Sequence, residues 1–172
     1  MADRTLIKGA IVLTQDEQLG ELHNADILIE GDRIAAVGPN LAVGEDVKVI
    51  DGTDRIVIPG FIDTHRHTWE TSIRSCAPDY ALITYFSGIL DQFAPKYRAE
   101  DVLAANRWGA LECINAGITT LVDWSHIMNT DDHADAAIEG LRDTGIRSVF
   151  AFGFPNTSIQ DWWFGPDWSG ST

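Results

Sequence analysis

The sequence predicts an α/β protein in which a small β-rich domain precedes a unit of alternating strands and helices. Short β-type runs separated by turn residues fill the chain up to about Ile58. After Pro59-Gly60, amphipathic helical segments alternate with β-branched runs, which is the pattern of βαβ units. We therefore expect one domain at 1–58 and a second at 59–172.

The first domain contains a clear β-hairpin. In "DILIEGDRIAAVG" two apolar strands flank Gly31-Asp32, and such turns favour residues that tolerate positive φ. The runs "LIKGAIVLT", "VKVIDG" and "RIVIPG" add strands, so we expect a small antiparallel sheet or a sandwich. Its titratable residues show no site-like spacing, and a structural role is predicted.

Three helices are expected in the second domain. The first covers "DYALITYFSGILDQF" (79–93), where apolar residues recur at intervals of three and four. The second, "EDVLAANRWGALECINAG", has two acidic residues in its first turn and ends at Gly117. The third starts at Asp131, is capped by Thr130 or Asn129, and ends before Gly145.

Strands near 57–63, 120–123 and 148–152 alternate with these helices, which predicts a parallel sheet covered on both faces. The final stretch, "FPNTSIQDWWFGPDWSGST", has neither period and is expected to be a loop. Its tryptophans, Trp162, Trp163 and Trp168, are predicted to form an apolar patch that meets a missing part of the fold.

Charge and composition exclude several classes of partner. The chain has 26 acidic and 12 basic residues, a formal charge of −14, which argues against nucleic acid and anionic membranes. A small neutral or cationic substrate is easier to accommodate, although the acidic groups could serve only solubility. There is no signal-peptide pattern, no membrane-spanning run and no CxxC pair, so we expect a cytoplasmic protein.

The stretch "FIDTHRHTWE" carries the strongest chemical signal. His65 and His67 are two residues apart, and residues i and i+2 of a strand point to the same face, which suits a pair of metal ligands. The alternative is two half-buried imidazoles bonded to neighbouring carbonyls. Polar and aromatic residues also follow the other strands, at 123–126 and 154–156, and ligands gather at the carboxyl ends of parallel strands. This convergence favours the metal hypothesis.

"VIPGFIDTHRH", preceded by a β-rich segment and followed by "NAGITTLVDW", resembles the amidohydrolase superfamily. The similarity is to its cytosine-deaminase-like, triazine-hydrolase and methylthioadenosine/adenosylhomocysteine-deaminase branch, and it extends to about Asn156. It implies the N-terminal segment of a metal-dependent (β/α)8 barrel, preceded by a small β-sandwich domain, with about three of eight barrel strands present. It also implies that His65 and His67 bind the catalytic divalent metal.

The function implied by the resemblance is hydrolytic deamination of a heterocyclic amine by metal-activated water. Zinc is the first choice of ion, with iron, manganese and cobalt as alternatives. The remaining ligands of the family lie on later strands, so the isolated chain is expected to bind metal weakly and to be inactive. The expected partners are a small-molecule substrate, the missing part of the barrel or a complementary chain, and further copies of the complete enzyme. No catalytic residue is assigned.

Four further residues are weighed. His126 is a candidate for substrate contact, against a role only in bonding its own loop, and Trp69 is a candidate pocket wall. Asp63 is a candidate partner that orients an imidazole, against a plain strand-end hydrogen bond. His133 falls on a predicted helix and is expected to be solvated.

Two alternative functions stay open. One is a hydrolase of the same family that cuts an amide, urea-like or carbon–halogen bond. The other is a non-catalytic or split-enzyme module that needs a second chain, because the remaining metal ligands are missing from these residues.

Overall fold

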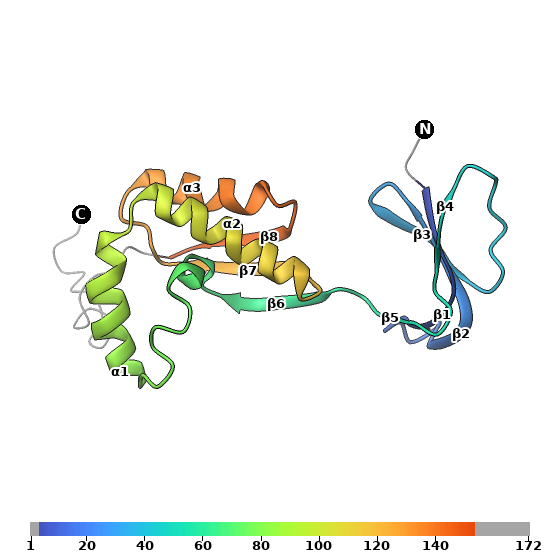
Figure 1. Cartoon of the computed structure of the whole chain (residues 1–172), viewed down its shortest axis with the longest axis horizontal. Helices are drawn as coiled ribbons and strands as arrows, with labels where there is room; N and C mark the ends of the chain where they lie inside the picture. The colour runs from blue at the N-terminus through green and yellow to red at the C-terminus, as the bar shows by residue number, and fades with distance from the viewer. Residues whose placement is uncertain (1–3, 154–172) are drawn as a thin grey trace. The chain divides into compact units, whose positions relative to one another are not determined.

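The computed structural model describes residues 4–153. The chain divides into two compact units, Met1–Pro59 and Gly60–Thr172, and each is described by itself (Figure 1). The tryptophan-rich final stretch and residues 154–156, on which some predictions fall, lie outside the described residues.

The first unit is a five-stranded mixed sheet. Its strands are β1 (Arg4–Leu13), β2 (Glu21–Glu30), β3 (Arg33–Gly38), β4 (Lys48–Asp51) and β5 (Ile56–Val57). The order is β3-β2-β1-β4, and β5 also pairs with β1. The predicted β2–β3 hairpin is confirmed, with Gly31 at a φ of 61°. The antiparallel expectation is right for β1, β2 and β3 but wrong for β4 and β5, because the chain after β3 loops back and returns alongside β1 in the same direction.

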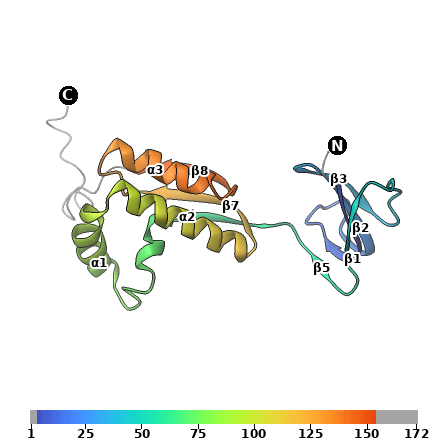
Figure 2. The same ribbon diagram turned by 45° about the horizontal axis from the view of Figure 1, so that its top comes forward.

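The second unit contains a parallel sheet of order β6-β7-β8 (Figures 1 and 2). Its strands are β6 (Phe61–Arg66), β7 (Ile118–Ser125) and β8 (Arg147–Phe152), and its longer helices are α2 (Ala99–Asn115) and α3 (Asp131–Arg142). Each long helix joins two parallel neighbours, so the predicted βαβ arrangement is confirmed. Along β7, Leu121, Asp123 and Ser125 are buried while Trp124 is exposed, so one face of the sheet is covered and the other is open.

The first strand of this sheet starts later than predicted. The expected strand at 57–63 is wrong at its start, because β5 pairs with β1 and β6 begins at Phe61. Pro59 has no backbone N–H to donate, so it interrupts strand pairing. Gly60 follows, and a Cβ there would come within 2.3 Å of the Thr119 side chain. The glycine therefore allows the close approach of β6 to the start of β7.

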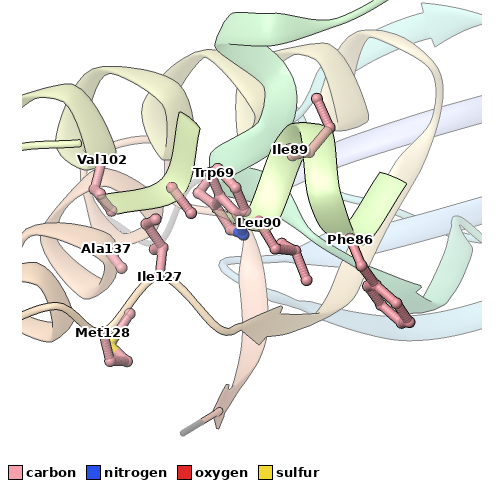
Figure 3. Close-up of a cluster of buried hydrophobic side chains, with 9 residues drawn as sticks. Trp69, Phe86, Ile89, Leu90, Val102, Ile127, Met128 and Ala137 are labelled. Carbon is pink, nitrogen blue, oxygen red and sulfur yellow. The ribbon is translucent and has the colours of Figure 1, made fainter. Parts of the chain in front are cut away.

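A long excursion separates β6 from α2. It contains η1 (Thr68–Ile73), α1 (Leu82–Tyr85), η2 (Phe86–Phe93) and η3 (Ala94–Lys96). The predicted helix at 79–93 exists as α1 and η2, but η2 is a π-helix. Its apolar side chains pack with Trp69 and with residues before and on α3, forming the largest buried cluster of this unit (Figure 3). The excursion is therefore part of the core.

The two long helices approach each other closely. Gly140 on α3 faces α2, and a Cβ there would lie 2.7 Å from the Leu103 carbonyl oxygen. At the start of α3 the prediction of a solvated His133 is wrong, because that side chain is buried. Its Nδ1 bonds the Thr130 hydroxyl at 2.8 Å and its Nε2 bonds the Tyr97 carbonyl at 2.9 Å. The imidazole ties α3 to the segment that precedes α2.

Within residues 4–153, the structure holds no helix that is both long and apolar enough to cross a bilayer. Cys76 is exposed and Cys113 is buried, and both are free thiols.

Candidate metal-binding site

His65 and His67 lie at the carboxyl end of β6. Their ring centroids are 5.1 Å apart and their planes are nearly perpendicular, at 84°. The Trp124 ring, which lies on the open face of the sheet, is 5.1 Å from the His65 ring. The two imidazoles are therefore close neighbours, as the strand period predicts.

The hydrogen bond of His67 defines its tautomer. Its Nδ1 lies 2.8 Å from the carbonyl oxygen of Trp124. A carbonyl oxygen can only accept, so Nδ1 carries the proton and, in the neutral ring, Nε2 keeps its lone pair. A backbone carbonyl commonly orients a metal-binding histidine in this way.

Asp63 contacts the main chain beside the histidines. Its Oδ1 accepts the backbone N–H of His65 at 3.1 Å, and its Oδ2 lies 4.0 Å from Nη1 of Arg66. Within residues 4–153, the Asp63 side chain contacts this amide and this guanidinium and bonds no imidazole. The Asp63 carboxylate thus bonds the backbone of His65 and not its ring. This arrangement is closer to the alternative of a plain strand-end hydrogen bond than to a partner that orients an imidazole.

His126 and Trp69 form a buried pair next to His67. The indole Nε1–H of Trp69 donates to Nδ1 of His126 at 3.2 Å, and the rings of His126 and His67 are 4.1 Å apart. Burial, followed by the charge of His67, lowers the pKa of His126 to about 3, so the ring is neutral at pH 7. Both residues are almost fully buried, and neither reaches the surface in this arrangement.

A buried carboxylate holds the segment that follows the histidines. Asp123 on β7 accepts the Thr68 backbone N–H at 3.1 Å and the Asn106 side-chain amide at 3.0 Å. Asn106 also donates to the carbonyl of Ala137 on α3 at 3.2 Å. Desolvation raises the pKa of Asp123 despite these bonds. Sequence reasoning missed Asn106, although an asparagine on the buried stripe of α2 is itself unusual and points to a buried partner.

The donor set fits part of a metal site. Catalytic zinc sites usually have three protein ligands, and His65 and His67 are two imidazoles that could serve as two of them, with the Nε2 lone pair of His67 set by its hydrogen bond. Within residues 4–153, the His, Cys, Asp and Glu side chains do not form a group of three or more arranged to hold an ion. The described residues therefore offer two candidate ligands and no third.

No family model matches the chain. Curated relatives do match it: a 5'-deoxyadenosine deaminase from Methanococcus aeolicus is 33% identical over 148 residues, which cover 83% of this chain and 33% of the relative. A 5-methylthioadenosine/S-adenosylhomocysteine deaminase from Symbiobacterium thermophilum is 32% identical over 153 residues, 88% of this chain and 34% of the relative. The chain spans about a third of the length of these relatives.

Solved structures give the same picture. A triazine hydrolase from Arthrobacter aurescens matches with a TM-score of 0.76 and 35% identity, covering 85% of this chain and 34% of that one. An atrazine chlorohydrolase from the same organism, complexed with zinc, matches with a TM-score of 0.75 and 35% identity, covering 84% of this chain and 34% of that one. In sequence and in fold, the chain is therefore similar to about a third of the length of enzymes named as deaminases and triazine hydrolases. These relatives and structural neighbours support the resemblance to the deaminase and triazine-hydrolase branch of the amidohydrolase superfamily.

Proposed function

We propose that this chain supplies the first two metal ligands, His65 and His67, of a hydrolase that deaminates a heterocyclic amine. The observation that carries the proposal is the hydrogen bond from His67 Nδ1 to the Trp124 carbonyl. It leaves the lone pair of Nε2 available to a metal ion, beside the His65 ring. A divalent ion held there, zinc in the first instance, would activate water by lowering the pKa of water from about 15.7 toward 7.

The role of the chain in this reaction is to position groups. β7 orients His67 through the Trp124 carbonyl, and Asp123 fixes the Thr68 amide that follows it. Asp63 accepts a hydrogen bond from the His65 backbone, and we propose that this bond helps to position His65 as a metal ligand. His126 and Trp69 pack behind His67, and substrate contact by either would require them to become accessible.

The remaining parts of the fold are also proposed. The parallel sheet would be the first three strands of a (β/α)8 barrel, since sequential parallel strands with α-helical crossovers are its repeating unit. The first unit would contribute to a β-sandwich, with the other strands supplied by residues beyond those described. The whole enzyme would need the later strands, or a complementary chain, for its other ligands and its catalytic residues.

Zinc binding by the chain tests the metal proposal directly. Because two imidazoles leave most of the coordination sphere to water, we expect weak binding, with a dissociation constant in the micromolar range or above. Isothermal titration with zinc should show this binding, and it should be lost in His65→Ala. His23→Ala removes an exposed histidine of the first unit and is the matched control. Zinc binding that survives His65→Ala would refute the assignment.

The second candidate is cleavage of a carbon–halogen bond. It is favoured by the similarity to a chain described as an atrazine chlorohydrolase. The two chemistries share water activation and differ in the leaving group, so the same metal ligands serve both. In a complete enzyme containing this chain, release of ammonia from an amino-heterocycle supports deamination, whereas release of chloride from a chlorinated ring supports the second candidate.

A further inference from the structure

Two consecutive residues of β7 bond the two residues that follow β6. The backbone carbonyl of Trp124 lies 2.8 Å from Nδ1 of His67, and the Asp123 side chain accepts the Thr68 backbone N–H at 3.1 Å. The first bond orients the imidazole, and the second fixes the residue that directly follows it in the chain. The orientation of the His67 ring therefore depends on the position of Asp123 as well as on the Trp124 carbonyl.

Asp123 is fully buried, so the position of its carboxylate depends on hydrogen-bond partners. Its Oδ1 accepts from Thr68, and its Oδ2 accepts from Nδ2 of Asn106 at 3.0 Å. A buried carboxylate oxygen that loses its donor costs free energy, because water cannot replace the missing bond. Without Asn106 the carboxylate would turn to another donor or take up a proton, and either change would disturb its bond to Thr68.

Asn106 connects this carboxylate to two helices. It lies on α2 and is fully buried, and its Nδ2 also donates to the Ala137 carbonyl on α3 at 3.2 Å. A carbonyl oxygen and an ionised carboxylate only accept hydrogen bonds, so the orientation of the amide is defined and both N–H groups of its nitrogen are used. Within residues 4–153 its Oδ1 has no hydrogen-bond partner. The nitrogen alone therefore makes the connection.

We propose that Asn106 is a positioning residue for His67. By holding the Asp123 carboxylate, Asn106 fixes the Thr68 amide. This keeps Nδ1 of His67 on the Trp124 carbonyl and leaves the Nε2 lone pair available. The proposal rests on the proposed function only in taking His67 as a metal ligand, since the orientation of the ring is a property of the metal-free chain.

The test replaces Asn106 by leucine in the whole 172-residue chain and measures the tautomer of His67. At pH 8, where histidine is ordinarily neutral, the ¹⁵N chemical shifts of the two ring nitrogens distinguish the protonated nitrogen from the other. The unaltered chain should carry its proton on Nδ1, and a proton on Nε2 would overturn the proposal. In Asn106→Leu the two shifts should move toward each other, because a ring that loses its hydrogen bond populates both tautomers. Unchanged shifts in the folded variant would also overturn it.

Two control variants separate positioning from a general loss of stability. Leu141→Ala removes a buried side chain from the apolar cluster that includes Cys113 and Leu121, and it should lower stability without moving the His67 shifts. Asn115→Leu makes the same substitution at an exposed position of α2 and should change neither. If Leu141→Ala moves the His67 shifts as far as Asn106→Leu does, the effect is a loss of packing and the proposal fails.

Exchanging the two side chains provides a rescue. In the double variant Asn106→Asp with Asp123→Asn, the amide at position 123 can accept from Thr68 and donate to the carboxylate at position 106. The bond to Ala137 is given up, but the connection to Thr68 is kept, so the His67 shifts should return to those of the unaltered chain. A folded double variant with the shifts of Asn106→Leu would contradict the proposal.

The unaltered chain decides the case if these variants fail to fold. The side-chain amide protons of Asn106 are buried and bonded to two acceptors, so they should exchange slowly after transfer to deuterated water. Exchange as rapid as that of the exposed Asn115 amide would overturn the proposal.

Zinc affinity connects this positioning to the metal proposal. Removing a group that orients a metal-binding histidine typically weakens metal binding by about 10- to 100-fold, so we expect zinc to bind Asn106→Leu about tenfold more weakly in isothermal titration. The ring shifts are measured without zinc, so the two proposals fail separately. Moved shifts together with zinc binding that survives His65→Ala keep the positioning role and remove the metal assignment. Unmoved shifts with zinc binding lost in His65→Ala do the reverse.

Discussion

His133 shows how one buried imidazole can connect separate segments. Both of its ring nitrogens form hydrogen bonds. One bonds the hydroxyl of Thr130, the residue before α3, and the other bonds the Tyr97 carbonyl before α2. Because a carbonyl only accepts, Nε2 carries the proton and Nδ1 of the neutral ring accepts from Thr130. The same residue type at His67 also bonds a backbone carbonyl, but through Nδ1, which leaves Nε2 available.

His133→Ala should therefore destabilise the chain. It leaves the Tyr97 carbonyl without this donor and opens a cavity at the start of α3, so we expect a loss of about 2 kcal/mol in the free energy of unfolding. Urea denaturation followed by circular dichroism measures it. His23→Ala, at an exposed position, should change stability by less than about 0.5 kcal/mol, and equal effects of the two changes would show that the His133 contacts contribute nothing.

Residue-level reasoning could reach His65 and His67 but not their surroundings. The i, i+2 spacing alone predicts that the rings are neighbours, as observed. The Trp69–His126 and Asp123–Asn106 bonds join residues 57 and 17 positions apart, and no local pattern encodes such pairings. His133 was misjudged for the same reason, because its burial depends on the chain before α2.

At the scale of elements, α2 begins with a cap in which the Asp101 carboxylate accepts hydrogen bonds from Arg98. Asp101 accepts the backbone N–H of Arg98 at 3.0 Å and also bonds its guanidinium. These bonds lower the pKa of Asp101 to about 2 from the usual 3.8. The sequence predicted the acidic first turn correctly, and the structure adds the arginine that closes the cap.

Asp101→Asn should lower stability by about 1 kcal/mol at pH 7, the typical contribution of a helix cap. Since the folded pKa lies below the unfolded one, the stabilisation is present above pH 4 and is lost as the pH falls toward 2. The difference in urea midpoint between the two chains should therefore shrink between pH 5 and pH 2.5. Asp135→Asn, an exposed change within α3, is the control, and a pH-independent difference would contradict the mechanism.

Helices and strands with a clear hydrophobic periodicity could be predicted from the sequence, but their boundaries were predicted less accurately. α2 and α3 occupy the ranges that their end signals predict, and β7 and β8 lie at the predicted positions. The start of β6 was missed because the apolar run before Pro59 is continuous with it in sequence, whereas its pairing is with β1. Strand partners, parallel or antiparallel, are set by the path of the loops, and this is why β4 and β5 were assigned the wrong direction.

At the scale of the molecule, the open face of the β6-β7-β8 sheet exposes large apolar side chains to solvent. Ile62 and Val149 are 65% and 59% exposed, and Trp124 is 42% exposed. Parallel sheets normally have both faces covered. Combined with relatives about three times as long, this surface agrees with a chain whose partner elements lie outside the described residues.

The chain should consequently self-associate through this face. Sedimentation velocity at increasing concentration should reveal dimers or larger species, because exposed apolar surface of this kind drives association. Ile62→Lys with Val149→Lys should reduce the association, since charge opposes burial. Ile34→Lys, at a similarly exposed position of the first unit, should leave it unchanged, and an unaltered double variant would exclude the open face as the contact.

The Asp123 bond to the Thr68 amide also sets the order in which this region is built. Thr68 and Asp123 are 55 positions apart, and His67 meets the Trp124 carbonyl across 57 positions. The chain between them must close into a loop before either contact forms, so we expect His67 to acquire its orientation only when β6 and β7 pair. The orientation of His67 therefore depends on the folded sheet.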